Sequence, residues 1–229
     1  MVIDIGVCPS TPTDLGAFVQ IARKLGFTGI ATHNIEGEPD QLLKNEFTIL
    51  KRSDVFGRGL KSIRKQVDNV RKHSMIVSVK LASVETANWA AEDQRVDLLT
   101  IDSSQAYRLR NSTARLAATS DTALEIRIEP LLHLVGLNRS KVIKVYREAI
   151  LTAIDSEMQV ILSSGALHPL HMRSAMAIRY LGELLGMGLK YAGNAINQAP
   201  LDLVERNRRR FSSEYVAEGV EILQRGTKK

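Results

Sequence analysis

Histidine and carboxylate side chains spread along this sequence could bind a divalent metal ion. The stretch "VILSSGALHPLHMRSA", residues 160–175, places His168 and His171 three residues apart beside Arg173. A catalytic metal site needs several such ligands converging on one point, and it would make the chain a stand-alone metal-dependent phosphoesterase. The sequence has no His-x-His and no His-Glu-x-x-His pattern, so helix capping or packing is the simpler role for this pair. The candidate ligands for the metal hypothesis are Asp4, His33, Asp102, Glu129 and His168.

Nucleophilic catalysis has little support in the residue spacing. Cys8 has no histidine near it in the sequence, and cysteine often packs as a small apolar side chain. Ser163 and Ser164 stand in "LSSGA" rather than in a Gly-x-Ser-x-Gly elbow, and hydroxyls at such a turn commonly bond the backbone. Lys80 could form a Schiff base in a barrel enzyme for a small phosphorylated metabolite, although lysines at strand ends are often only solvated. We keep these alternatives open, but we predict no catalytic residue and no metal or cofactor bound by the chain.

Basic residues form the strongest chemical pattern. The chain has 31 Lys and Arg against 25 Asp and Glu, with a net charge of +6 and a pI near 9.5, which favours an acidic partner such as nucleic acid. Lys and Arg gather in residues 51–72, 107–115, 139–147 and 205–210. One such run is commonly a solvated helix face, but four of them favour a polyanion. Aromatic residues make up only 5% and do not interleave with these runs, so contact with the backbone of a folded nucleic acid is favoured over stacking on single-stranded bases.

Seven short apolar runs must position these side chains. The runs are continuous rather than alternating, which is typical of parallel strands buried on both faces. Helix-like segments separate them, which indicates βαβ units, and the absence of an obvious switch point favours a closed (β/α) barrel over an open doubly wound sheet. An eighth strand would have to follow Gly188, where the sequence shows none. The predicted strands are 2–7, 27–32, 47–50, 75–81, 98–102, 124–128 and 159–163.

Three of the intervening segments carry helix signals. The first spans residues 11–26, with Thr11 as N-cap, Pro12 in the first turn and Gly26 as the stop. The other two are residues 139–155 and residues 167–186, the second read as one long helix. No Ser/Gly/Pro-rich linker divides the chain. We therefore predict an α/β fold with one TIM-like barrel domain, in a regular or a distorted form, over residues 1–210, followed by a basic tail at 211–229 that frays.

Cysteine usage and hydropathy bear on the compartment. A single cysteine excludes an internal disulfide and favours a reducing environment. The apolar runs are too short to span a membrane, and Asp4 stands where a signal peptide would carry positive charge. We expect a cytoplasmic protein with no membrane partner.

Three segments of the second half resemble a known family when they are taken in order. They are "EIRIEPLL", "VILSSGALHPLHMRSAMAIRYLGELLGM" and "AGNAINQAPLDLVERNRRR". The set is similar to the thirty-kilodalton-class protein subunit of archaeal and eukaryotic ribonuclease P, also called protein component 3. The resemblance covers residues 96–210 well and the first 95 residues in outline, where "DIGVC" is similar to the first strand of the family.

The resemblance implies a TIM-like barrel related in fold to the polymerase-and-histidinol-phosphatase phosphoesterases. Those enzymes begin with an Asp-x-His-x-His type of strand. Here the corresponding residues are Asp4-Ile5-Gly6-Val7-Cys8, so both ligand histidines are absent. The resemblance therefore implies a barrel kept as a scaffold rather than as a metal enzyme.

The resemblance also implies a role in the endoribonuclease that removes the 5′ leader of precursor tRNA. In that ribonucleoprotein the RNA and its Mg²⁺ ions carry out the chemistry. The implied partners are the ribonuclease P RNA, a small ferredoxin-like protein subunit and, through the holoenzyme, precursor tRNA. Arg127 lies within a predicted strand and could instead pair with Glu125 or Glu129. The predicted RNA-binding residues are Arg64, Lys65, Arg108, Arg110, Arg127, Lys141, Lys144, Arg173 and Lys190.

Overall fold

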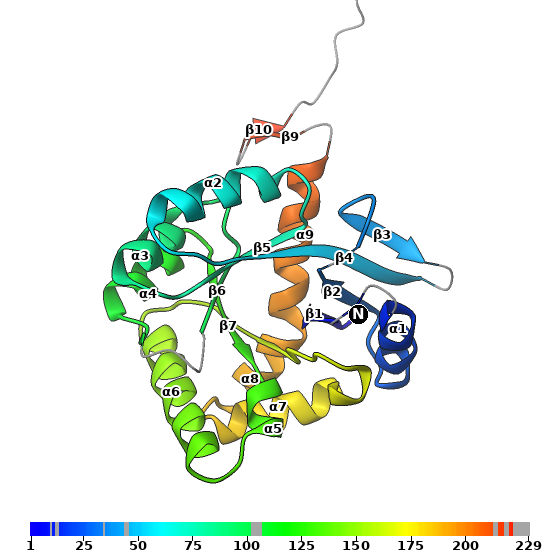
Figure 1. The fold of residues 1–229 in the computed structure, drawn as a ribbon, viewed down its shortest axis with the longest axis vertical. Coiled ribbons are helices and arrows are strands. Elements are labelled where there is room, and N and C mark those ends of the chain that lie inside the picture. Colours follow the sequence, from blue (N-terminus) through cyan, green and yellow to red (C-terminus); the bar gives the residue numbers. More distant parts are fainter. Residues whose placement is uncertain are drawn as a thin grey trace, which may run out of the picture.

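Seven parallel strands curve around a common core and form a nearly closed barrel (Figure 1). The computed structural model describes residues 1–9, 11, 14–33, 35–43, 46–101, 107–212, 215–217 and 220–221. In sheet order the strands are β1 (Ile3–Val7), β2 (Gly29–Thr32), β4 (Phe47–Val55), β5 (Ile76–Lys80), β6 (Leu98–Thr100), β7 (Ala123–Arg127) and β8 (Val160–Ser163). A short strand, β3 (Asp40–Leu43), pairs antiparallel with the first half of β4. The seven predicted strands and the barrel are thus confirmed.

Strand β4 is longer than predicted. The apolar run ends at Leu50, but the strand continues to Val55 and its second half pairs with β5. The added half contains Arg52 and Asp54, which a buried strand tolerates because their charges are paired inside the barrel. A polar stretch in the sequence was therefore wrongly taken as the end of the strand.

The described residues contain no eighth parallel strand. Gly188 is followed by the helices α8 (Leu189–Ile196) and α9 (Gln198–Phe211), and the short strands β9 (Tyr215–Ala217) and β10 (Val220–Glu221) pair only with each other. The gap between β1 and β8 is closed by single hydrogen bonds instead. Cys8 N donates to Ala166 O over 2.9 Å, and Ser164 N donates to Asp4 Oδ1 over 3.1 Å.

Helix α9 seals the N-terminal end of the barrel, which it crosses in Figure 1. Its Leu203 and Val204 belong to one apolar cluster with Ile76 and Leu98, the first residues of β5 and β6. Asn207 Nδ2 also donates to Met75 O over 2.9 Å. The opposite, C-terminal end of the strands is consequently the end at which a pocket can open.

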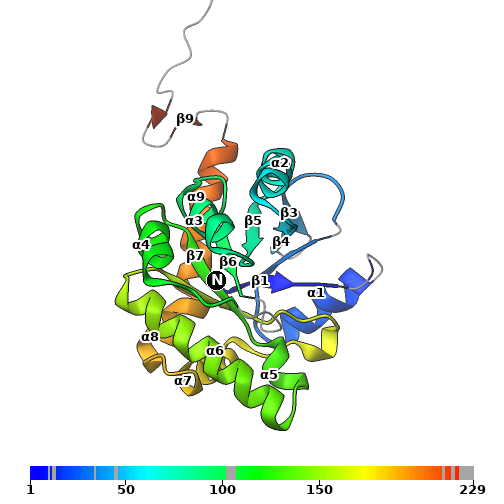
Figure 2. The same ribbon diagram turned by 60° about the vertical axis from the view of Figure 1, so that its left-hand side comes forward.

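Helices cover the outer face of the strands (Figure 1, Figure 2). The first predicted helix begins at Leu15 rather than near Thr11, and Gly26 stops it with a φ of 87°, while Pro12 lies outside the described residues. The segment 167–186 is not one helix. It begins with a 3₁₀ turn at Pro169–His171, where the prolyl ring occupies the first position of the turn. A separate helix follows, with Ser174 as its N-cap. The remaining bounds are α1 (Leu15–Lys24), α2 (Leu60–Arg71), α3 (Val84–Glu92), α4 (Asn111–Thr119), α5 (Glu129–His133), α6 (Gly136–Asp155) and α7 (Ala175–Leu184).

The barrel and its helices extend to the end of α9 at Phe211. Most of the predicted tail at 211–229 lies outside the described residues, so its fraying stays a prediction. No helix in the described part of the chain is both long enough and apolar enough to cross a membrane.

Candidate functional site

Charged side chains fill the upper part of the barrel interior. Side chains of a strand alternate between its two faces, so Arg52 and Asp54 of β4 point to one side, as do Glu125 and Arg127 of β7. These four residues meet inside the barrel, above the apolar layer that contacts α9. Arg52 and Glu125 are almost fully shielded from solvent, with exposed fractions of 2% and 0%.

Glu125 accepts hydrogen bonds from four side chains. Arg52 binds both of its carboxylate oxygens, over 2.6 Å and 2.5 Å. The hydroxyls of Ser163 and Thr100 donate to it over 2.7 Å and 2.8 Å, and Arg127 Nε donates over 3.2 Å. Burial alone would raise the pKa of Glu125, but the charges of Arg127 and Arg52 outweigh it and lower that pKa to about 2. The carboxylate is thus held ionised and has no free coordination capacity for substrate.

Gly6 of β1 makes room for this network. A Cβ at position 6 would lie 2.4 Å from Ser163 Oγ and 2.8 Å from Glu125 Oε1. Both distances are below van der Waals contact, so a side chain there would displace the carboxylate or its hydroxyl partner. Glycine is required at this position by close packing, not by its backbone angle.

Asp54 continues the network toward the mouth of the barrel. Its Oδ1 accepts from Arg52 Nε over 2.8 Å, and its Oδ2 is bound by Arg127 Nη2. Burial raises the pKa of Asp54, but Arg52 and Arg127 outweigh burial and hold that pKa well below its usual range. His33 Nε2 lies 3.5 Å from Asp54 Oδ2 and 3.4 Å from Cys8 Sγ. Burial lowers the pKa of His33 and raises the pKa of Cys8, so both are held in their neutral forms.

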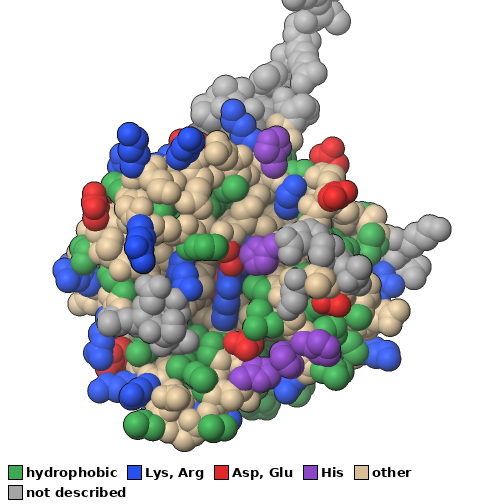
Figure 3. Space-filling view, in the orientation of Figure 1, with side chains coloured by type: hydrophobic (Ala, Val, Ile, Leu, Met, Phe, Trp, Pro, Cys, Tyr) green, Lys and Arg blue, Asp and Glu red, His purple; other side chains and the backbone are tan. Residues whose placement is uncertain are grey.

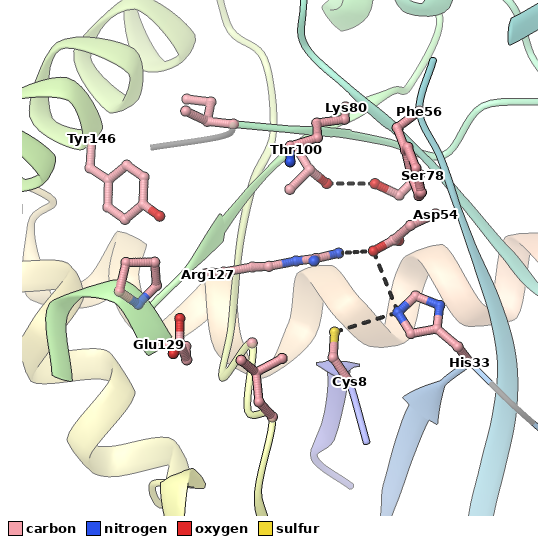
Figure 4. A pocket seen from close by; sticks show the side chains of 14 residues that line it. Cys8, His33, Asp54, Phe56, Ser78, Lys80, Thr100, Arg127, Glu129 and Tyr146 are labelled. Carbon is pink, nitrogen blue, oxygen red and sulfur yellow. Dashed lines mark hydrogen bonds and ion pairs between the residues drawn. The ribbon is translucent and has the colours of Figure 1, made fainter. Parts of the chain in front are cut away.

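A cavity of about 480 Å³ opens at the C-terminal mouth of the barrel (Figure 4). Cys8, His33 and Asp54 line one wall, and Figure 4 shows Arg127 reaching across toward Asp54. The cavity combines charged groups with an apolar wall. The other lining residues are Phe56, Ser78, Lys80, Thr100, Ile101, Glu129, Pro130, Tyr146, Gly165 and Leu167.

The metal ligands suggested by the sequence do not assemble. Asp4 is fully buried, where its Oδ1 accepts from the backbone of Gly6 and Ser164, and Asp102 lies outside the described residues. His168 Nδ1 accepts from Leu170 N and caps the 3₁₀ turn, which confirms the capping role. In the described part of the chain, one group of three potential ligands comes together, and of the predicted set it includes only His33.

Exposed Lys and Arg side chains lie on and beside a row of neighbouring helices on the outer face of the barrel. We call this surface the α2–α6 flank; α3 packs against α2 and α4, and α4 packs against α6. Figure 3 shows basic side chains along this upper and left rim of the molecule. Its members are Arg58, Lys61, Arg64, Lys65, Arg108, Arg110, Arg115, Lys141, Lys144 and Arg147.

Most charges of the α2–α6 flank are not neutralised by the protein. Glu148 is shared between Arg108, at 2.7 Å, and Lys144, at 3.9 Å, and both cations remain more than half exposed. Arg64 lies over the Trp89 ring at 5.4 Å, a contact that leaves its charge in place. The flank is therefore a positive surface formed by separate helices. Within the described residues no ion pair forms at Lys61, Lys65, Arg110, Arg115, Lys141 or Arg147.

The nine predicted RNA-binding residues fall into four environments. Arg127 lies in the barrel mouth and pairs with Glu125 and Asp54, so the pairing with Glu125 foreseen from the sequence is present. Arg173 Nη1 donates to Leu170 O and Met172 O over 2.9 Å and 2.8 Å, and so stabilises its own turn. RNA contact by these residues stays a prediction. The flank contains Arg64, Lys65, Arg108, Arg110, Lys141 and Lys144, whereas Lys190 is exposed on α8.

The basic run at 205–210 forms ion pairs with the barrel rather than an exposed basic patch. Arg206 Nη2 lies 3.0 Å from Asp97 Oδ1, and Arg208 Nε lies 2.6 Å from Asp40 Oδ2. Arg210 is also within 3.6 Å of Asp97. These ion pairs fix α9 against the N-terminal end, so this run is not a free basic patch.

The interior network was missed by the sequence analysis. Its signal is the occurrence of opposite charges two residues apart in strands, Arg52 with Asp54 and Glu125 with Arg127. Positions i and i+2 share a face, so such a pair within a buried strand indicates partners on a neighbouring element. No sequence pattern predicts the contact between Cys8 and His33, because 25 residues separate them.

Comparison with known proteins gives one consistent result. Residues 1–212 match the family model described as RNase P subunit p30. Ribonuclease P protein component 3 of Methanosarcina barkeri is 29% identical over 212 residues, which cover 90% of this chain and 88% of the relative. The protein of the same name from Methanothermobacter thermautotrophicus is 25% identical over 220 residues, covering 88% and 87%. A chain from a solved structure, "cryo-EM structure of archaeal Ribonuclease P with mature tRNA", superimposes with a TM-score of 0.81 at 18% identity, covering 99% of this chain and 100% of that one, and shows the same fold.

Proposed function

The chain belongs to the RNase P subunit p30 family, and on this premise we propose that it is a protein subunit of the ribonucleoprotein that removes the 5′ leader of precursor tRNA. The catalytic RNA and its Mg²⁺ ions carry out the hydrolysis. The protein supports the RNA fold, together with a small ferredoxin-like protein subunit, and meets precursor tRNA within the holoenzyme. The assembly works in the cytoplasm.

The α2–α6 flank is the observation that carries this proposal. A folded RNA brings phosphates close together, and Lys and Arg placed against them relieve the repulsion and release condensed counterions. The exposed charges of Lys65, Arg110 and Lys141 are available for this because no acidic side chain of the described residues pairs with them. Contacts of this kind position an RNA without reading its sequence.

The barrel interior supports a scaffold role for the chain itself. A hydrolase needs an acid, a base or a metal with free coordination capacity. Glu125 instead has both of its carboxylate oxygens engaged by Arg52, and burial keeps Asp4 away from the cavity. The stand-alone phosphoesterase is therefore the less favoured function.

Copurification tests the proposal directly. The tagged chain is isolated from its own cells, and the eluate is assayed for 5′ cleavage of precursor tRNA before and after treatment with micrococcal nuclease. We expect activity that copurifies and is lost when the RNA is destroyed. Activity that survives RNA destruction, or an eluate with neither activity nor RNA, would contradict the proposal.

A further inference from the structure

Three different metal-ligating side chains face one another at the barrel mouth (Figure 4). Cys8 and His33 follow directly after β1 and β2, and Asp54 lies near the end of β4. Cys8 Sγ is 3.4 Å from His33 Nε2, which is 3.5 Å from Asp54 Oδ2, and all three ligand atoms lie within 4.8 Å of one another. Adjacent strands thus bring together a sulfur, a nitrogen and an oxygen ligand.

Two of the three separations between these atoms suit a tetrahedral site. Zinc binds cysteine sulfur at about 2.3 Å and histidine nitrogen or carboxylate oxygen at about 2.0–2.2 Å, so neighbouring ligand atoms around it lie about 3.4–3.6 Å apart. The two observed separations, 3.4 Å and 3.5 Å, fall in that range. Asp54 Oδ2 is also bound by Arg127 Nη2, so an ion at this point would take the place of that guanidinium contact.

The same geometry excludes a proton relay. A cysteine nucleophile activated by histidine needs the thiol at one ring nitrogen and the carboxylate at the other. Here a single nitrogen, His33 Nε2, faces both Cys8 and Asp54. That nitrogen can either accept a proton from the thiol or donate one to the carboxylate, so one of the two contacts stays unsatisfied. A cation between the three atoms would satisfy all of them.

We propose that Cys8, His33 and Asp54 bind a zinc-class divalent cation, with a fourth coordination position open to the mouth cavity. Binding releases the Sγ proton of Cys8 to solvent and leaves a thiolate ligand. His33 would coordinate through the Nε2 of a neutral imidazole and Asp54 through a carboxylate oxygen. The sulfur and nitrogen ligands favour a thiolate-preferring cation over Mg²⁺, whereas the nearby guanidinium groups of Arg52 and Arg127 weaken the binding of any cation.

The proposal departs from the sequence-based expectation that the chain binds no metal. It retains His33 from the suggested ligand set and replaces the others with Cys8 and Asp54. It is independent of RNA binding, because the site lies inside the mouth and the α2–α6 flank lies on the outer helices. A failed metal test would leave the proposed function intact.

Cobalt titration of the purified, metal-free chain tests the site. Co²⁺ bound by a thiolate gives near-ultraviolet charge-transfer absorption, and tetrahedral Co²⁺ gives intense visible bands. We expect both to saturate at one equivalent, to disappear on adding Zn²⁺ and to persist on adding Mg²⁺. Cys8→Ser should remove the charge-transfer band, and His33→Gln should weaken binding more than about tenfold. His133→Gln is the matched control, because His133 also has a carboxylate neighbour, Glu129, and a histidine neighbour, His171, but no cysteine.

A measurement on the unaltered chain guards against variants that do not fold. Cys8 is the single cysteine, so its rate of modification by a thiol reagent reports on this site alone. We expect Zn²⁺ to slow that reaction more than about tenfold, and a chelator to restore it. Absence of the thiolate band together with an unchanged modification rate would overturn the proposal. So would binding that survives Cys8→Ser and is lost in His133→Gln.

Discussion

Two sets of arginines in this chain lie in opposite environments. Arg52 and Arg127 lie inside the barrel, where Glu125 and Asp54 match their charges. Arg110 lies on the α2–α6 flank, exposed and without an acidic partner among the described residues. An interior arginine cannot neutralise a phosphate without leaving a carboxylate unpaired, whereas a flank arginine can do so at little cost.

The comparison shows that a run of basic residues in the sequence is not one functional unit. Arg52 and Arg58 belong to the same run, yet the first is buried in β4 and the second is exposed ahead of α2. The strand period of two decides which charges turn inward. The density of basic residues in a sequence therefore predicts a polyanion partner only when the buried basic residues are left out.

Breaking the interior pair should give the largest effect. In Arg52→Met the carboxylate of Glu125 loses its bidentate partner while it remains buried, and we expect the free energy of unfolding to fall by about 3–5 kcal/mol. Urea titration of the purified chain measures the change. Arg110→Met on the flank is the control and should change it by less than about 0.5 kcal/mol.

A double variant sharpens the interpretation of that loss. Arg52→Met with Glu125→Leu removes both charges, and it should recover part of the stability lost in the single variant, because no unpaired buried charge is left. Equal stabilities for Arg52→Met and Arg110→Met would show that a buried arginine contributes no more to stability than an exposed one.

The pH dependence of stability should depend on Glu125. Its pKa is about 2 in the folded chain against an ordinary value of 4.5, so its contribution is complete above about pH 4.5 and is lost as the pH falls toward 2. We expect the wild type to lose stability on acidification more steeply than Glu125→Gln, which cannot titrate. Urea titrations between about pH 3 and pH 7 compare the two slopes. Parallel curves would mean that Glu125 takes up its proton at the same pH in the folded and unfolded chains.

The sequence predicts the scaffold better than the network inside it. Continuous apolar runs reveal the seven strands because burial on both faces leaves a local signature. The pairing of Arg52 with Glu125 joins residues 73 positions apart, and no local pattern encodes which inward charge meets which. The sealing of the barrel by α9 is hidden for the same reason, since Leu203 meets strands that lie far earlier in the chain. The flank residues could be predicted because exposed helical charges need no partner.

The packing of the interior network can be tested at a glycine. In Gly6→Ala the new Cβ would press on Ser163 Oγ and Glu125, and we expect a loss of about 1–3 kcal/mol in the free energy of unfolding. Gly16→Ala is the control, since Gly16 is exposed in α1 with nothing within 4 Å of a Cβ, and it should stabilise the chain by about 0.5–1 kcal/mol. Thermal or urea unfolding measures both changes, a loss of stability in Gly6→Ala and a gain in Gly16→Ala. A neutral Gly6→Ala would mean that the carboxylate can move without loss.

The flank should show the smallest effect on stability and a distinct effect on RNA binding. Arg64→Gln with Lys65→Gln removes two exposed charges of α2, and we expect the free energy of unfolding to change by less than about 1 kcal/mol, the value of the contact between Arg64 and Trp89. If both side chains contact phosphates, the slope of the logarithm of RNA affinity against the logarithm of salt concentration should fall by about two. Binding of the chain to ribonuclease P RNA over a series of KCl concentrations measures that slope.

A second double variant separates position from net charge. Lys24→Gln with Arg209→Gln removes the same charge from exposed sites on α1 and α9, outside the flank. Because neither side chain lies on the flank, this variant should leave the slope unchanged and should weaken binding only through the smaller overall charge. Equal slopes for the two variants would mean that RNA responds to the charge of the whole protein. The flank would then have no privileged role, and the difference between the two sets of arginines would concern stability alone.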